Sequence, residues 1–302
     1  MTVPMLPNQQ FNIGNIVSLA SYLYRSNFKK FFRLSLFAHL WLIVPIYGWA
    51  KFYAFAGLIS RLVFCEISDQ PESSEVAKSQ IKKRFWQFLI TAIIVILICL
   101  VKFLFFYIGL SIIGGIIYAV LAMFFGAISQ PINRANPFGN TIFTIILIPI
   151  AIAIYFSPLW FYSRFFITDL PLAIEDDTNF IGAIKRSRQL SKGLTWRMIA
   201  IIFLSFVVTL PIQILGWMIY SIGFRVLIQL ISLLLYKDWA NENERFISVL
   251  FLMISNLING ITLMPFWQSI KSVVYYQIIC RQEGFDLKIC DRTIEITSDE
   301  NK

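Results

Sequence analysis

Long apolar runs alternate with short polar segments along the whole chain. The apolar runs cover residues 31–64, 86–128, 141–167, 198–235 and 246–279. About 20 apolar residues in a helix cross the hydrocarbon core of a bilayer, so several runs are longer than one straight crossing needs. The pattern predicts an all-α integral membrane protein with about six transmembrane helices, in a range of roughly five to seven.

Basic residues are concentrated in four segments that flank these runs. Residues 25–33, 61–84, 164–197 and 271–302 together hold 20 of the 26 Lys and Arg residues. The segments 129–140 and 237–245 hold only Arg134 and the pair Lys237 and Arg245, respectively. The positive-inside rule therefore predicts a multi-pass membrane protein with both termini in the cytoplasm.

Three runs leave their topology open. With cytoplasmic flanks, residues 31–64 must cross twice, and each arm is about 22 Å long, which is short of a hydrocarbon core of about 30 Å. A shallow hairpin that turns near Pro45 to Trp49 and one long kinked helix are both possible. The four cations at 25–33 favour the hairpin. Residues 111–128 and 221–236 are interfacial helices, re-entrant pieces or extensions of long helices.

Two stretches of the chain share the spacing of their Trp and Pro residues. Trp86 to Pro158 is 72 residues and Trp196 to Pro265 is 69, and each proline begins a Pro-x-Trp sequence. We interpret one polytopic domain, 1–302, as pseudo-repeats 12–66, 73–175 and 178–283 followed by a polar cytoplasmic tail, 284–302. Trp and Pro are also frequent near membrane-helix ends, which would produce this spacing without a repeat.

Each pseudo-repeat begins with a basic segment of amphipathic character. Apolar residues recur at helical spacing after residue 12 and more loosely after residue 73, and Asp177 or Thr178 can cap the third segment, which Gly193 ends. We expect cytoplasmic amphipathic helices with their apolar side in the acyl boundary and their cations among anionic headgroups. The candidate lipid- or partner-binding residues are Arg25, Lys29, Lys30, Lys82, Lys83, Arg84, Lys185, Arg186, Arg188, Lys192 and Arg197.

The composition excludes an ordinary soluble protein. Hydrophobic residues make up 58% of the chain and charged residues 14%, against about a quarter charged in soluble domains. Because the net charge of +9 is concentrated in the flanking segments, it indicates orientation and lipid contact, with no nucleic acid as a partner.

Few polar groups in the apolar runs could carry chemistry. We expect Lys51, Lys102 and Arg225 to extend to the outer surface, and His39 to be packed or hydrogen-bonded. The crossings contain no acid, the four cysteines have no metal-ligand spacing, and no catalytic or nucleotide-binding motif occurs. We therefore predict no enzyme activity, no metal and no cofactor.

Two stretches carry the sharpest local pattern. Residues 185–197 read Lys-Arg-Ser-x-x-Leu-x-x-Gly-x-x-Trp-Arg, and a Tyr-Tyr pair precedes Arg-x-Glu-Gly-x-Asp-Leu near the end. The second stretch is a candidate cytoplasmic motif made of Tyr275, Tyr276, Arg281, Glu283, Gly284 and Asp286. Here the chain resembles a bacterial family of polytopic membrane proteins, whose domain is also attached to some glycerophosphodiester phosphodiesterases. Gln277 and Ile279 depart from that pattern.

The resemblance implies a helical membrane unit of about six segments in a bacterial inner membrane or another internal membrane. It does not imply the phosphodiesterase, which belongs to a separate soluble barrel. We expect Arg281, Glu283 and Asp286 to pair with Lys185, Arg186 and Arg188 across the cytoplasmic face.

These features favour a non-enzymatic integral membrane protein. Its basic cytoplasmic face would bind anionic membrane lipid or a membrane-protein partner, in membrane organisation, assembly or homeostasis. The alternative is a transporter or channel for a lipid-like or small apolar solute, which the repeats and the proline-interrupted helices would suit.

Overall fold

The structure, a computed structural model, describes residues 12–70, 72–126, 137–175, 178–234 and 237–283. Every regular element in these ranges is an α-helix. The helices are α1 (Ile13–Ser26), α2 (Phe28–Trp41), α3 (Tyr47–Ile67), α4 (Ser74–Lys83), α5 (Phe85–Gly126), α6 (Pro137–Ser163), α7 (Asp169–Ile174), α8 (Phe180–Leu190), α9 (Thr195–Leu234) and α10 (Lys237–Glu283). The predicted tail, 284–302, lies outside the described residues.

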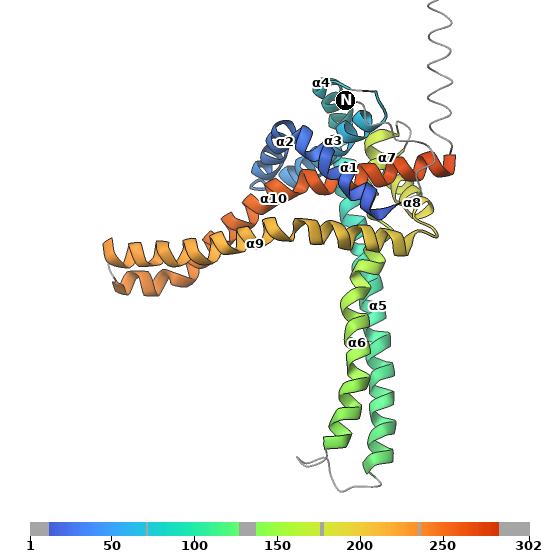
Figure 1. The fold of residues 1–302 in the computed structure, drawn as a ribbon, viewed down its shortest axis with the longest axis vertical. Coiled ribbons are helices and arrows are strands. Elements are labelled where there is room, and N and C mark those ends of the chain that lie inside the picture. Colours follow the sequence, from blue (N-terminus) through green and yellow to red (C-terminus); the bar gives the residue numbers. More distant parts are fainter. Residues whose placement is uncertain (1–11, 71, 127–136, 176–177, 235–236, 284–302) are drawn as a thin grey trace, which may run out of the picture.

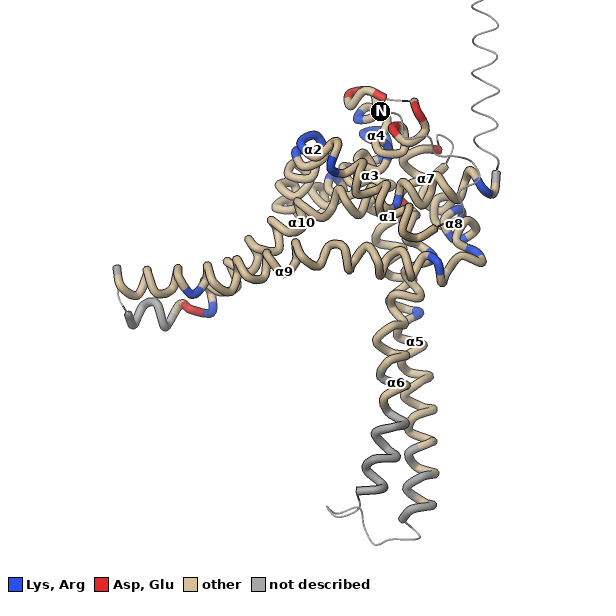
Figure 2. Tube along the Cα trace, viewed as in Figure 1, with Lys and Arg blue, Asp and Glu red and all other residues tan. Residues whose placement is uncertain are grey.

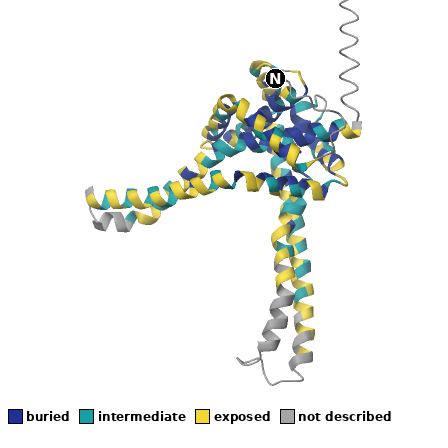
Figure 3. Ribbon diagram, in the orientation of Figure 1, coloured by how far each residue is buried: buried dark blue, intermediate teal, exposed yellow. Residues whose placement is uncertain are grey.

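The helices form a packed core from which two long hairpins project (Figure 1). The core contains α1–α4, α7 and α8 together with the adjoining ends of the long helices. The hairpins α5/α6 and α9/α10 leave the core in different directions, and exposed residues predominate along them (Figure 3). Among the described residues, Phe85–Ile117, Thr195–Leu233 and Asn243–Gln282 are long and apolar enough to cross a membrane. The prediction of an all-helical chain compatible with a membrane protein is confirmed.

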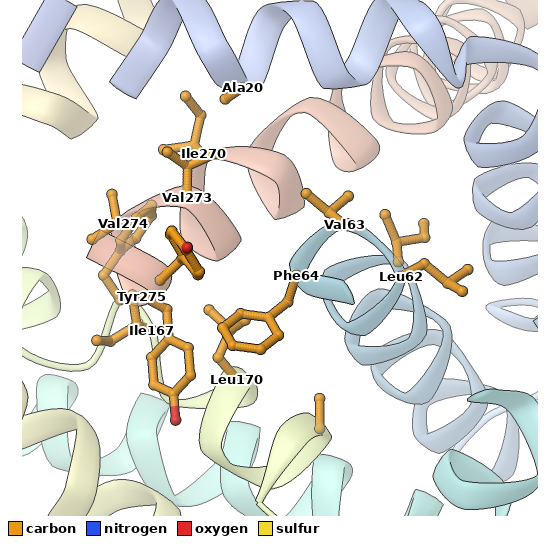
Figure 4. Packing of buried hydrophobic residues seen from close by; sticks show 14 of the residues in the cluster. Ala20, Leu62, Val63, Phe64, Ile167, Leu170, Ile270, Val273, Val274 and Tyr275 are labelled. Carbon is orange, nitrogen blue, oxygen red and sulfur yellow. The ribbon is translucent and has the colours of Figure 1, made fainter. Parts of the chain in front are cut away.

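The core forms around the last third of α10 and the last turns of α3. Ile270, Val273 and Tyr275 of α10 are fully buried. Side chains from α1, α3 and the segment leading into α7 surround them (Figure 4). At Gly57 in α3, an added Cβ would overlap the ring of Phe88, so the glycine permits the close approach of α5.

Side-chain caps start three of the short helices. Asn12 accepts from the N–H of Gly14, Ser73 from that of Val76 and Asn179 from that of Gly182. The cap of α8 is therefore Asn179, not the predicted Asp177 or Thr178. Gly193 has a φ of 80°, a left-handed conformation that glycine adopts easily, and the chain turns there between α8 and α9.

The apolar side of α1 packs against protein. Ile16, Val17, Ala20, Leu23 and Tyr24 are buried, and α1 contacts both α10 and α9. The Tyr24 hydroxyl donates to the carbonyl of Thr262 at 2.9 Å, and burial raises the pKa of Tyr24 to about 12. The expectation that acyl chains cover this apolar side is wrong for α1, because α10 already covers it.

The first apolar run folds as a hairpin of α2 and α3. The chain turns over residues 42–46, where the N–H of Tyr47 bonds to the carbonyl of Pro45 at 2.7 Å and Ile46 has φ 61° and ψ −66°. These angles are those of a classic γ-turn, which is rare and strained. The rings of Tyr47 and Phe85 lie 5.8 Å apart, so the turn adjoins the basic segment 61–84 and is not separated from it by a bilayer.

The apolar runs 111–128 and 221–236 extend long helices as far as the structure describes them. Residues 111–126 continue α5, and residues 221–234 continue α9. In α5, buried side chains such as Phe88, Leu89 and Val95 pack in the core before the helix projects from it. From Leu100 to Gly126 the helix rises about 40 Å, enough for a hydrocarbon core of about 30 Å.

The order of short and long helices recurs along the chain. A short helix precedes two further helices in α1–α3, α4–α6 and α8–α10. The three short helices begin near residues 12, 73 and 178, where the pseudo-repeats are predicted to start. The pseudo-repeats themselves stay a prediction.

Candidate functional site

Polar side chains from several elements meet at Glu175, which follows α7. Its carboxylate accepts hydrogen bonds from the Tyr275 hydroxyl at 2.8 Å, from Arg186 Nε at 3.0 Å and from the Thr178 hydroxyl at 2.8 Å. Its carbonyl accepts from Arg84 Nη1 at 2.7 Å. Glu175 thereby connects α10, α8 and the junction of α4 with α5.

Two further ion pairs hold elements of the core together. Arg61 Nε lies 2.7 Å from Glu72, and Arg61 Nη1 donates to the carbonyl of Ala173 at 2.7 Å. Lys271 Nζ lies 3.1 Å from Asp169, with both side chains less than 20% exposed. Because each of these carboxylates faces a cation of the same chain, the arrangement is suited to fixing α3, α7 and α10 rather than to acid–base chemistry.

Burial and charge also determine the state of the Cys65 thiol. Burial, with a smaller contribution from the neighbouring Glu72 carboxylate, raises the pKa of Cys65 to about 11. The Sγ atom lies 3.8 Å from Glu72 Oε2. The thiol is therefore protonated at neutral pH and is a poor nucleophile. Among the described residues, no group of three His, Cys, Asp or Glu side chains is arranged to hold a metal ion.

Most of the predicted lipid- or partner-binding cations lie on the outside of the core. The exposed ones are Arg25, Lys29, Lys30, Lys82, Lys83, Lys185, Arg188, Lys192 and Arg197. Figure 2 shows basic residues over α2 and α4 and again over α8 and the start of α9. Arg84 and Arg186 are only partly exposed and are bonded to Glu175. The sequence pattern alone did not separate these two structural arginines from the exposed cations.

The predicted cytoplasmic motif is only partly described. Tyr275 and Tyr276 are buried in the core, and Arg281 is exposed in the last turn of α10. The Glu283 side chain, Gly284 and Asp286 lie outside the described residues, so their predicted pairing with α8 stays a prediction. Arg186 bonds to Glu175, a residue that the motif did not include.

Lys51 and Lys102 lie close to the core and not at the far ends of the hairpins. Lys102 Nζ lies over the ring of Phe165, 4.9 Å from its centre, beside the basic segment 164–197. Lys51 Nζ lies 5.1 Å from the centre of the Trp41 ring. The expectation that both reach the outer surface is wrong, because Lys51 lies on α3 in the core and Lys102 lies where α5 leaves the core, over Phe165. Arg225 is exposed on the α9/α10 hairpin.

His39 is a packed residue, as expected. It is 7% exposed, and its Nδ1 lies 2.8 Å from the carbonyl oxygen of Ser35, which accepts its proton. A Cβ at Gly260 would approach the imidazole to within 2.8 Å, so this glycine allows α10 to lie against α2.

A groove of about 220 Å³ lies between α3, α4 and the start of α5. Its apolar lining is Tyr47, Ala54, Phe55, Leu58, Ile81 and Phe85, and its cations are Lys51, Lys78 and Lys82. Only Lys82 belongs to the predicted binding set. Lys51 lies in an apolar run, and Lys78 lies in the basic segment whose apolar spacing is the least regular. Only the fold therefore brings the three lysines together.

No protein-family model matches the chain, and no curated protein and no solved structure is similar to it. The resemblance drawn above therefore rests on the two short stretches alone.

Proposed function

We propose that this protein is a non-enzymatic integral membrane protein whose basic core binds anionic lipid, or a membrane-protein partner, in membrane organisation, assembly or homeostasis. The unequal use of charge in the core is the observation that supports this most directly. Glu72, Asp169 and Glu175 are bonded to cations inside the core. Glu66, Asp69 and Glu75 are exposed, but the exposed cations of the predicted binding set outnumber these three acids. Cations of α2, α4 and α8 are left on its surface, where they can meet anionic headgroups at about 1 kcal/mol each.

The proposed topology places the core at the cytoplasmic surface of a bacterial inner membrane or another internal membrane. The hairpins α5/α6 and α9/α10 would cross the bilayer, and both chain ends would be cytoplasmic. The segment 237–245, which is poor in cations, lies at the end of the α9/α10 hairpin that is distant from the core (Figure 1). The predicted count of about six crossings would require α2 and α3 to cross as well. The 14 residues of α2 extend about 21 Å, so a shallow insertion suits this hairpin better.

The resemblance to the membrane domain of some glycerophosphodiester phosphodiesterases remains part of this proposal. It agrees with a helical membrane unit that has no catalytic role of its own. The alternative function, transport of a lipid-like or small apolar solute, stays a prediction.

Lipid co-purification tests the proposal. The full chain is extracted from native membranes, and bound lipids and proteins are identified by mass spectrometry. We expect anionic lipid to be enriched over its share of the membrane, or one protein to be retained in constant ratio. The variant Lys185→Gln/Arg188→Gln/Lys192→Gln, called the α8 variant below, removes exposed charge from α8 and from the turn that follows it, and should reduce that enrichment. Lipid in membrane proportion, with no retained protein, would argue against the proposed function.

A further inference from the structure

We propose that the groove between α3, α4 and α5 is a binding site for one anionic phospholipid of the bilayer, with the phosphate held by Lys51, Lys78 and Lys82. This inference rests on the proposed function and assigns it a particular site. Two observations on neighbouring elements support it independently: the charge of the groove and the apolar turn beside it.

The groove combines cations with an apolar floor. Its residues include three lysines and no acid, and none of these lysines forms an ion pair with a residue that the structure describes. Lys78 and Lys82 are four residues apart on one side of α4. Lys51 lines the same groove from α3, with its Nζ 5.4 Å from the centre of the Tyr47 ring. A phosphodiester placed among three ammonium groups would have its charge neutralised.

The apolar part of the lining fits the beginning of an acyl chain. Ala54, Leu58 and Ile81 are buried below the lysines, and Tyr47 and Phe85 form one end of the groove with their rings 5.8 Å apart. A volume of about 220 Å³ is smaller than the roughly 300–1,000 Å³ of pockets that enclose a drug-sized ligand, so only the part of a lipid around its phosphate fits and the acyl chains must continue outside the protein. A bilayer phospholipid provides this arrangement, whereas free phosphate would leave the apolar floor uncovered.

The turn beside the groove presents apolar side chains outward. Ile43 is 81% exposed and Ile46 61%, with Trp49 and Trp86 also exposed nearby. The γ-turn at Ile46 holds a β-branched residue at positive φ, and Gly48 is packed against the carbonyl of Trp41, where a Cβ would overlap it. Strained backbone that is held in place at a surface suggests a function for that surface. In the acyl boundary this turn would bring the adjoining groove to the level of the headgroups.

The test measures phosphatidylglycerol bound to the full chain in detergent by native mass spectrometry, with phosphatidylcholine as the zwitterionic comparison. We expect the wild-type chain to retain one phosphatidylglycerol. The variant Lys51→Gln/Lys78→Gln/Lys82→Gln should bind it at least about tenfold more weakly. A pair of single variants separates the groove from general surface charge. Lys82→Gln should weaken binding more than Lys83→Gln, because both lysines are exposed cations of α4 in the predicted binding set but only Lys82 lines the groove. Unchanged helical circular dichroism and melting would show that each variant folds.

The outcomes separate the site from the proposed function. If the groove variant retains the lipid while the α8 variant Lys185→Gln/Arg188→Gln/Lys192→Gln loses it, the groove is not the site and the proposed function stands. If no chain, including the wild type, prefers phosphatidylglycerol, the groove proposal fails, and the proposed function fails with it unless a protein partner is retained from native membranes. Equal loss in the Lys82→Gln and Lys83→Gln variants would also overturn the groove, because it would reflect general surface charge.

A second measurement tests the turn. A photoreactive diazirine amino acid at position 43 should cross-link to lipid in phosphatidylglycerol nanodiscs, and the same group at Asp69, at the opposite end of α3, should not. Equal lipid cross-linking at the two positions, or none at position 43, would contradict insertion of the turn.

Discussion

At the scale of single residues, Glu175 shows how the core uses its acids. Its carboxylate accepts from Tyr275, Arg186 and Thr178, which come from α10, α8 and the loop between α7 and α8. The ion pair with Arg186 is partly exposed, at 30% and 29% of the two side chains, and therefore contributes little on its own. The hydrogen bond from the buried Tyr275 hydroxyl is more consequential, because water cannot readily replace an acceptor that is lost inside the core.

Replacing Glu175 should therefore destabilise the core. We expect Glu175→Ala to cost about 1–3 kcal/mol, from the lost hydrogen bonds of the buried Tyr275 hydroxyl and of Arg186. The control is Glu75→Ala on α4, an exposed acid whose removal should leave stability unchanged. Thermal melting in detergent measures both variants. Equal melting temperatures for the two variants would mean that Glu175 does not hold the core together.

The Cys65 thiol should react slowly in the folded protein. With a pKa of about 11, the thiolate fraction at neutral pH is far below that of an ordinary cysteine, whose pKa is about 8.5. Maleimide labelling, followed at the Cys65 peptide by mass spectrometry, should accelerate about tenfold per pH unit up to the raised pKa. Denaturation should restore ordinary reactivity, and rapid labelling of the folded chain at pH 7 would refute the buried, protonated thiol.

At the scale of elements, close helix contacts depend on particular glycines. Gly57 of α3 faces the ring of Phe88, and Gly109 of α5 has no atom of the described structure within 4 Å of an added Cβ. The two positions provide a matched pair on apolar helices, one in the core and one on a projecting hairpin. The methyl group that alanine adds must fit against α5 at position 57, whereas it has free space at position 109.

The two alanine variants should therefore change the stability of the protein in opposite directions. Gly57→Ala should lower stability by about 1–3 kcal/mol through overpacking, whereas Gly109→Ala should be neutral or stabilise the helix by up to about 1 kcal/mol. Detergent melting curves of the two variants measure the difference. A Gly57→Ala chain as stable as the wild type would show that α3 and α5 are less closely packed than described.

The elements also explain which predictions from periodicity succeeded. Residues 13–26 form the predicted helix with its predicted apolar side. That side contacts α10, however, because apolar spacing is the same whether protein or acyl chains cover it. Likewise, the hairpin of α2 and α3 could be predicted from its polar flanks, but the position of its turn beside Phe85 depends on how α4 folds back along α3.

At the scale of the whole molecule, the two apolar hairpins leave the core in different directions (Figure 1). Both cannot follow the normal of one flat bilayer in this arrangement. Pro211 in α9 and Pro265 in α10 lie near the point where the second hairpin leaves the core, and each removes a helical hydrogen bond. Bending at these prolines costs less than bending an uninterrupted helix.

The hairpins should therefore become more nearly parallel in a bilayer. Spin labels at Ile112 of α5 and Ile222 of α9, both exposed, report the distance between them by pulsed electron paramagnetic resonance. We expect a shorter distance in lipid nanodiscs than in detergent, because a flat bilayer covers both apolar hairpins only when they lie side by side. An identical distance in the two environments would contradict this rearrangement.

The sequence by itself determined that the chain is helical, that its long helices are apolar enough for a membrane, and where its cations are concentrated. These properties follow from local composition and spacing, which every fold of this chain must respect. Only the tertiary structure decided that α2, α3 and the first turns of α5 belong to a packed core, that Arg84 and Arg186 bond to Glu175, and that Lys51, Lys78 and Lys82 share one groove. The physical reason is that an apolar face must be covered by protein or by acyl chains, and a charged residue requires a partner or water. Which neighbour meets that requirement depends on contacts between residues that are distant in the chain.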